Sequence, residues 1–188
     1  MDFLGPFHPL IVHTPIALII FSFVFDLAGR ALDADWWRRA AVVMLVIGVL
    51  GGAAAILSGE PASEVAEKKQ GIPEAQVERH EDIAKMSVWL GGGSLAARAI
   101  AAAIPGGGPA VAAVALLLHL ASAVSVGVAG YRGGELVYRH GAAVRMNGQL
   151  LRHGDGGGEA SAVAPTGAGP TAEPPASPPA PAPHGDAD

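Results

Sequence analysis

The stretch PLIVHTPIALIIFSFVFDLAGRAL, residues 9–32, decides the fold of this chain. Apart from one histidine, its only ionisable side chains are Asp26 and Arg30. The apolar core of a bilayer requires about 20 residues of helix, so this stretch is long enough to cross it. Similar apolar stretches lie at about residues 39–57, 83–104 and 110–130. The sequence therefore predicts roughly four membrane-spanning helices.

The composition is that of a membrane protein rather than a soluble domain. Of the 188 residues, 51% are hydrophobic and 15% are charged, and the mean hydropathy is +0.38. The alternating ten-residue segments typical of membrane β-barrels are not seen. We therefore expect an all-α fold, a four-helix transmembrane bundle. The chain has no cysteine, which excludes disulfides, a covalently attached c-type haem and cysteine-ligated iron–sulfur clusters.

The start of the first span is open between two positions. Either Pro9 lies in the first helical turn, or Thr14 caps the helix with Pro15 at its first position. The N-terminus lacks the basic segment and cleavage pattern of a signal peptide, so we expect this span to be retained. In the second span, Gly48 and Gly52 have the spacing of a small-residue packing face.

The remaining segments are expected to connect or follow the spans. Residues 59–79 carry mixed charge and predict a surface helix followed by a turn. The GGGS of Gly91–Ser94 predicts a flexible part of the third span. Residues 131–144 are amphipathic and predict an ordered segment at the membrane surface. We expect residues 1–153 to form the membrane domain and the Gly-, Ala- and Pro-rich residues 154–188 to be a disordered tail.

The number of spans fixes which segments share a membrane face. With four spans, both chain ends and residues 59–79 lie on one face, called face A below; the opposite face is face B. Eight of the 12 basic residues are then at face A: Lys68, Lys69, Arg79, Lys85, Arg132, Arg139, Arg145 and Arg152. Face B has Arg30, Arg38 and Arg39. Because cytoplasmic loops are rich in Lys and Arg, we expect face A and both termini to be cytoplasmic.

Five histidines belong to the membrane domain, and imidazoles are preferred ligands of haem iron, zinc and copper. Four are expected near face A: His8, His13, His80 and His140. His119 lies deeper, roughly 16 Å from face A, because each helical residue rises about 1.5 Å. An ionisable residue at that depth indicates a functional role.

Two sets of ligands are consistent with these positions. A haem would be held between helices by His13 with His80, the pair best matched by depth, or by His13 with His119. A Zn or Cu ion would be held by His8, His13, His80 and His140. In either case the expected partners that orient the ligating rings are Glu81 and Glu135. The alternative is that the histidines are polar caps, with His119 a neutral ring bonded to Ser87 or to a backbone carbonyl.

Asp26 on the first span and Arg98 on the third are the other charges predicted to meet. Each lies about 16 residues from face A, which places both at a depth of roughly 24 Å. Opposite charges at one depth in a bilayer are expected to pair. We interpret them as a structural ion pair that holds the bundle together.

Two motifs resemble a bacterial family of four-span membrane proteins catalogued as a domain of unknown function. They are HPLIVHTPIAL near the start and GGELVYRHGAAV after the fourth span, and the resemblance covers about residues 7–144. Its members are sometimes joined to electron-transfer modules of Rieske or cytochrome type, which implies a redox setting in the bacterial inner membrane. The motif positions present here are His8, Pro9, His13, Pro15, Gly133, Gly134, Glu135, Tyr138, His140 and Gly141.

Three functions remain open from the sequence. The first is a b-type haem protein that exchanges electrons with a quinone or a redox protein. The second is a membrane protein that binds Zn or Cu through its histidines. The third is a non-enzymatic scaffold or accessory subunit. We expect membrane lipid as a partner and no nucleic acid. No catalytic motif is recognisable, because nucleophile–base pairs, phosphate loops and paired catalytic carboxylates are not seen.

Overall fold

The computed structural model describes residues 2–104, 108–146, 149–150 and 152. In chain order the elements are a 3-10 helix η1 (Asp2–Phe7), the helices α1 (His8–Ile11), α2 (His13–Ala31) and α3 (Asp35–Glu64), a π-helical turn η2 (Val65–Lys69), the helices α4 (Glu74–Ala103) and α5 (Pro109–His140), and the strands β1 (Arg145–Met146) and β2 (Gln149–Leu150). The predicted tail, residues 154–188, lies outside the described residues.

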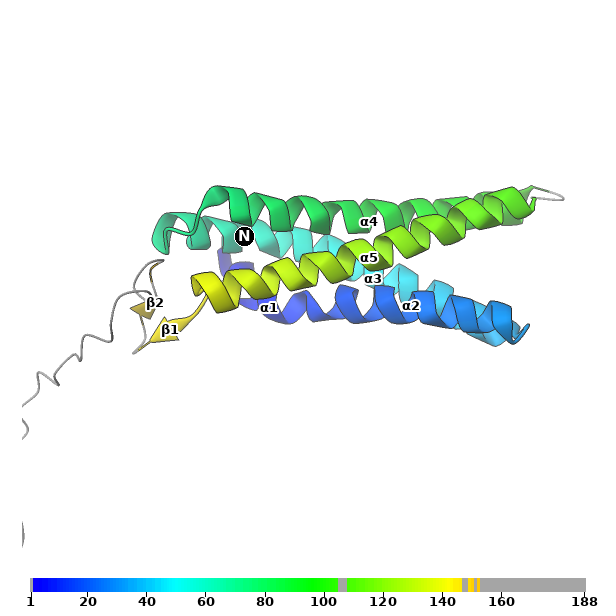
Figure 1. Ribbon diagram of the computed structural model, residues 1–188, viewed down its shortest axis with the longest axis horizontal. Helices are drawn as coiled ribbons and strands as arrows, with labels where there is room; N and C mark the ends of the chain where they lie inside the picture. Colours follow the sequence, from blue (N-terminus) through cyan, green and yellow to red (C-terminus); the bar gives the residue numbers. More distant parts are fainter. Residues whose placement is uncertain (1, 105–107, 147–148, 151, 153–188) are drawn as a thin grey trace, which may run out of the picture. The chain divides into compact units, whose positions relative to one another are not determined.

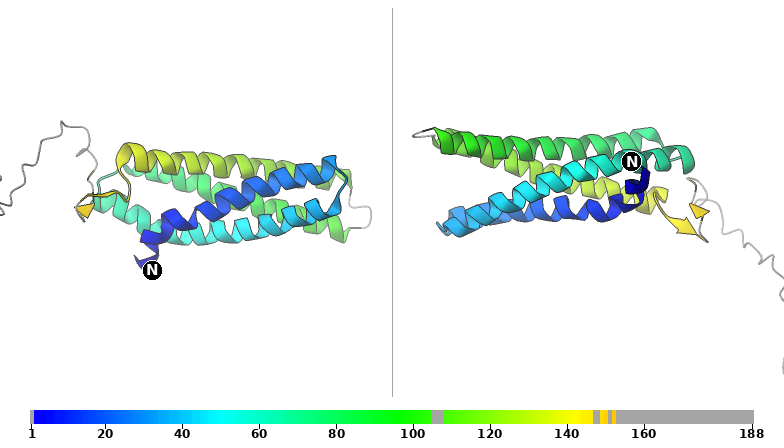
Figure 2. Two further views of the ribbon diagram at one scale, coloured as in Figure 1. Left: turned by 90° about the horizontal axis from the view of Figure 1, so that it is seen from below. Right: turned by 180° about the vertical axis from the view of Figure 1, so that it is seen from behind.

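Four long helices run side by side and make the bundle (Figure 1). Helix α2 packs along α3 and helix α4 packs along α5, so the bundle consists of two helical hairpins (Figure 2). Contacts between the hairpins are fewer and come mainly from α3 with α4 and from α2 with α5. The two short strands form an antiparallel hairpin in which Arg145 pairs with Leu150.

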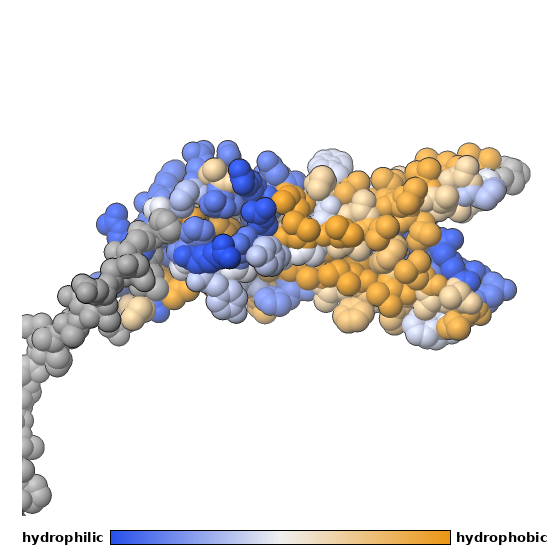
Figure 3. Space-filling view, viewed as in Figure 1, coloured by the Kyte–Doolittle hydropathy of each residue, from blue (hydrophilic) through white to orange (hydrophobic). Residues whose placement is uncertain are grey.

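Apolar side chains face outward and small or polar ones face inward. In α3 the buried positions Ala41, Leu45, Gly48 and Gly52 repeat every three or four residues along one face. By contrast, Trp89 is 80% exposed. Hydrophobic residues cover the middle of the helices in Figure 3, and hydrophilic residues gather at the end near the strands. Such a surface is stable only in an apolar solvent, as in a bilayer.

Three of the described helical segments are long and apolar enough to cross a membrane: Phe3–Ala31, Asp35–Lys69 and Pro109–His140. The expected third span lies in α4, which is less apolar because it contains Lys85 and Arg98. This helix nevertheless has 30 residues, like α3, and packs along α5. The fold is therefore an all-α, four-helix membrane bundle, as predicted.

Two helices run farther at face A than the sequence predicts. Residues 59–64 continue α3, and residues 131–140 continue α5. Helix α5 has 32 residues, which corresponds to a length of about 48 Å, more than the roughly 30 Å of a bilayer core. Polar residues in these turns are hydrated once the helix leaves the bilayer, so the change in composition does not end the helix.

The first span begins as one of the two alternatives predicted. Pro9 lies in the first turn of α1, a position where its missing N–H group costs little. The break at Val12 is slight, because its N–H donates to the His8 carbonyl and its own carbonyl accepts from Ile16. Pro15 is buried inside α2.

The Gly91–Ser94 segment is regular helix, so the prediction of a flexible segment is wrong. A Cβ atom on Gly91 would lie 2.8 Å from Val49 Cγ2 of α3, whereas one on Gly92 would meet nothing within 4 Å. Gly91 therefore allows close approach of α4 to α3. On α3, a Cβ on Gly48 would lie 2.8 Å from Ile19 Cγ1, so this glycine allows α2 to approach in the same way.

The end of α5 is held by a buried glutamine from the turn before α4. Gly141 has φ +69° and ends the helix in the left-handed conformation, and the Ala142 N–H donates to the Leu136 carbonyl. Gln70 is 1% exposed. Its Nε2 donates to the Gly141 carbonyl at 2.8 Å and its Oε1 accepts from the Ala143 N–H at 2.9 Å. Gly141, Ala142 and Ala143 of the end motif therefore cap the helix.

Candidate functional site

A polar cluster lies inside the bundle, where α2, α4 and α5 meet. The Asp26 carboxylate is fully buried, and its Oδ2 accepts a hydrogen bond from Arg98 at 2.6 Å. Arg30, one turn along α2, places its Nε 3.5 Å from Asp26 Oδ1. His119 is also fully buried, and its Nδ1 lies 3.1 Å from the same Arg98 nitrogen. This cluster joins the two hairpins.

The hydrogen bonds in this cluster define one tautomer of His119. An arginine only donates, so His119 Nδ1 accepts from Arg98 and the ring proton is on Nε2. Nε2 then donates to Ser22 Oγ at 2.7 Å. The Ser22 hydroxyl in turn donates to the Ile19 carbonyl at 2.8 Å. Because both ring nitrogens are engaged, His119 has no lone pair left for a haem or a metal ion.

A second cluster lies at face A and contains His8 of α1 and His80 of α4. Their ring centroids are 6.4 Å apart and the rings are nearly perpendicular, at 85°. His8 Nδ1 lies 3.0 Å from Ser58 Oγ of α3, and His80 Nδ1 lies 3.0 Å from the Ala129 carbonyl of α5. Four helices therefore position these two imidazoles.

The partners of these rings leave both Nε2 atoms available. A carbonyl only accepts, so His80 Nδ1 is protonated and donates to Ala129. Ser58 donates its hydroxyl proton to the Ala55 carbonyl at 3.0 Å, so His8 Nδ1 donates to Ser58 Oγ. In the neutral tautomer of each ring, Nε2 then carries the lone pair. This is the arrangement in which a histidine ligates a metal through Nε2 while Nδ1 is held by a second partner.

Two glycines leave the space that these rings occupy. A Cβ on Gly133 of α5 would lie 3.1 Å from His80 Cε1, and one on Gly59 of α3 would lie 3.3 Å from His8 Cε1. The neighbouring Gly134 would meet nothing within 4 Å. The first glycine of the GG motif is thus fitted to an imidazole, whereas the second is open to substitution.

His80 lies before Ile83, where the apolar part of α4 begins. Burial of its imidazole affects the protonation of the ring. Burial lowers the pKa of the His80 imidazole, while its bond to the Ala129 carbonyl and the nearby Glu81 carboxylate act in the opposite direction. The ring is therefore neutral at pH 7. Glu81 itself forms an ion pair with Lys85 at 2.9 Å, so it lies near the histidines as part of a surface pair.

The other predicted ligands lie elsewhere on the bundle. His13 is exposed, and its Nδ1 donates to the Pro9 carbonyl at 2.6 Å within its own helix. His140 lines a pocket at the end of α5. Glu135 pairs with Arg139 at 3.2 Å. Within residues 2–104, 108–146, 149–150 and 152, no three His, Cys, Asp or Glu side chains are grouped so that they could hold a metal ion.

The serines that hold the rings are the residues of the candidate site that the sequence analysis missed. Ser22 bonds to His119 and Ser58 to His8, and each serine also bonds to the carbonyl three residues before it. Both are fully buried. A single serine within an apolar helix is the available signal, because a hydroxyl in a bilayer helix usually bonds to a neighbouring group. A serine in the sequence does not show which side chain it bonds to.

Comparison with known proteins agrees with a membrane protein and assigns no activity. No curated protein matches the chain, and no solved structure matches it. The family model described as "Predicted membrane protein (DUF2231)" matches residues 5–146, a range that contains both histidine clusters. The chain therefore belongs to this family of membrane proteins of unknown function.

Proposed function

We propose that this protein is a membrane electron carrier that binds a b-type haem, which His8 and His80 would hold. The observation that carries the proposal is the contact between these imidazoles, whose ring centroids lie 6.4 Å apart. In both rings a hydroxyl or a carbonyl engages Nδ1, as is typical of metal-bound histidines. The proposal keeps one predicted ligand, His80, and replaces His13 with His8.

The number of donors favours haem over a bare ion. Structural zinc sites use four protein ligands and catalytic ones use three, and no such group occurs among the described residues. A porphyrin supplies four nitrogen ligands itself, so two imidazoles complete the coordination of its iron.

The residues of the chain have distinct roles in this proposal. Ser58 and the Ala129 carbonyl fix the two rings, and Gly59 and Gly133 leave room for them. A bound haem supplies reversible one-electron chemistry at its iron. From face A it would exchange electrons with a membrane quinone or a redox protein. The basic residues of face A support a cytoplasmic location for this face in the bacterial inner membrane.

The test is an absorbance spectrum of the detergent-purified protein, first air-oxidised and then reduced with dithionite, with metal analysis of the same sample. We expect a Soret band and sharp reduced α and β bands. His8→Ala and His80→Ala should each abolish them. His13→Ala is the matched control, because His13 is exposed and lies only five residues after His8, and it should leave the spectrum unchanged.

The glycines provide a finer test of the same ligands. Gly133→Ala places a methyl group against His80 Cε1 and should shift the reduced bands or lower the haem content, while Gly134→Ala should do neither. A colourless protein with stoichiometric zinc or copper would replace haem with a bare ion. A protein without either would leave the scaffold function.

A further inference from the structure

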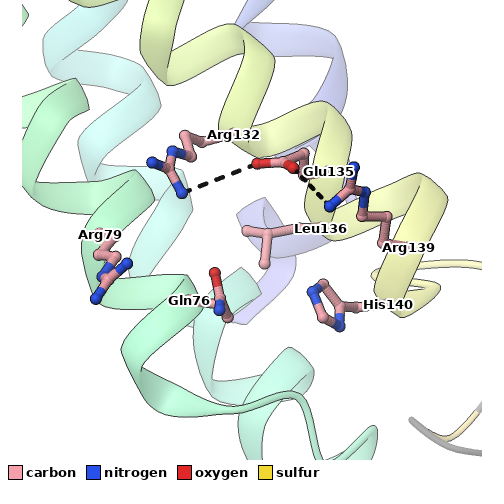
Figure 4. Close-up of a pocket in the computed structure, with 7 residues that line it drawn as sticks. All are labelled: Gln76, Arg79, Arg132, Glu135, Leu136, Arg139 and His140. Atoms are coloured by element: carbon pink, nitrogen blue, oxygen red, sulfur yellow. Dashed lines mark ion pairs between the residues drawn. The ribbon is translucent and has the colours of Figure 1, made fainter.

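We infer that a pocket between α4 and α5 at face A binds the phosphate headgroup of an anionic phospholipid. The cavity has a volume of about 300 Å³. Its polar wall comprises Gln76 and Arg79 of α4 and Arg132, Glu135, Arg139 and His140 of α5. Figure 4 shows Arg132 and Arg139 on either side of Glu135, with Arg79 and Gln76 on the neighbouring helix. The site does not depend on the haem proposal.

The pocket has more positive than negative side chains, which favours an anionic ligand. Glu135 is its one carboxylate, and this side chain pairs with both Arg132 at 3.9 Å and Arg139 at 3.2 Å. Arg79 forms no ion pair with any residue that the structure describes. Three guanidinium groups therefore face one carboxylate. A phosphate that accepts hydrogen bonds from Arg79 and Arg132 would bridge the two helices.

The depth of the pocket favours a lipid as the source of the phosphate. Tyr131 and Tyr138 of the same helical turns are 64% and 91% exposed. Exposed tyrosines collect at the level of lipid headgroups, so this part of α5 lies at that level. The buried Leu136 forms an apolar wall of the pocket, which suits the glycerol and acyl portion of a lipid. Basic pockets between membrane helices recognise anionic headgroups in this way.

The test measures lipid selectivity of the full chain in nanodiscs. The discs contain phosphatidylcholine with an equal amount of phosphatidylglycerol, and native mass spectrometry counts the lipids that stay bound. We expect the wild type to retain phosphatidylglycerol in preference to phosphatidylcholine. Arg79→Gln and Arg132→Gln should each lower that preference about fivefold, because each variant loses a charge-assisted hydrogen bond to the phosphate.

Two further variants make the result specific to this pocket. Arg39→Gln removes an exposed arginine at face B and should leave the preference unchanged. Glu135→Gln removes the competing carboxylate and should increase it. Equal retention of the two lipids by the wild type, or an equal loss in Arg39→Gln, would overturn the proposal.

Inorganic phosphate distinguishes the two sources of the anion. If 10 mM phosphate, added to protein in a neutral detergent, raises the melting temperature as much as phosphatidylglycerol does, the pocket binds free phosphate and the lipid assignment is wrong. We expect phosphatidylglycerol to stabilise the wild type and phosphate to have little effect.

Discussion

At the scale of single residues, the polar side chains buried in the described part of the bundle have hydrogen-bond partners. Within the described residues, no buried side-chain nitrogen or oxygen lacks a hydrogen-bond partner. The same unit is used at both clusters: a histidine nitrogen donates to a serine, and the serine donates to the carbonyl three residues before it. A polar group in a bilayer has no water to bond with, so each ring requires such a chain of partners.

Asp26→Asn should strongly destabilise the protein. The change leaves the buried Arg98 guanidinium without its carboxylate partner, and breaking a buried pair costs about 3–5 kcal/mol. The free energy of unfolding in detergent, from a denaturant titration, measures the loss. Asp35→Asn is the control, because that carboxylate pairs with Arg38 on the surface and exposed ion pairs contribute little to stability.

A double substitution separates charge from packing at this position. Asp26→Leu combined with Arg98→Met replaces the pair with apolar groups and should recover part of the lost stability, since such replacements are often neutral but His119 Nδ1 loses its donor. If the double variant is as unstable as Asp26→Asn, or if Asp26→Asn matches Asp35→Asn, the ion pair does not have the role described here.

The sequence predicts single residues well where depth decides the contact. Asp26 and Arg98 are predicted to lie at equal depth, and they are found in contact. Depth alone does not determine which way a side chain points around its helix. His13 is at the same depth as other histidines but faces outward, bonded to Pro9, and His8 takes the place beside His80. Which histidine faces the bundle depends on how α1 is rotated relative to α3. The contact between His8 and Ser58 of α3 shows that rotation, and the sequence alone does not.

At the scale of helices, close packing depends on which glycine faces a neighbour. Gly91→Ala should destabilise the bundle by about 1–3 kcal/mol, because its methyl group would overpack Val49. Gly92→Ala faces open space and should stabilise α4 by about 0.5–1 kcal/mol, as alanine is the better helix former. Thermal unfolding of the two variants measures the difference, and equal effects would contradict this packing.

The clamp from Gln70 should stabilise the end of α5. Gln70→Ala removes two hydrogen bonds to the backbone around Gly141 and should cost about 1–3 kcal/mol, because a buried N–H and a carbonyl lose their partner. Hydrogen exchange at the Ala143 amide should become much faster. Lys69→Ala changes the adjacent exposed residue and should leave that exchange unaffected; protection unchanged in Gln70→Ala would exclude the clamp.

The existence of the four helices could be predicted from the sequence, but the residues at which they end could not. The apolar stretches predict the four helices, since the bilayer sets their minimum length. Their ends at face A depend on where water begins and on particular caps. Residues 131–140 continue α5 until Gly141 takes a positive φ. The two-residue strands β1 and β2 are too short to leave a pattern in the sequence.

At the scale of the whole molecule, the position of the basic residues predicts an orientation. The chain has no cysteine, so single cysteines can be labelled without background. Asp35→Cys at face B should react with a membrane-impermeant maleimide in intact spheroplasts. Glu74→Cys at face A should react only after the membrane is permeabilised. The opposite labelling pattern would place face A, with both histidine rings, outside the cell.

The Asp26–Arg30 contact has a consequence for how the protein is made. Arg98 follows Asp26 by 72 positions, and a ribosome adds about 5–20 residues per second, so roughly 4–14 s separate the synthesis of the two. The first hairpin is complete before α4 exists. Throughout that interval Arg30, with its Nε 3.5 Å from the carboxylate, is already present one turn away. Arg30 is therefore available to pair with the Asp26 carboxylate in the bilayer until Arg98 has been synthesised.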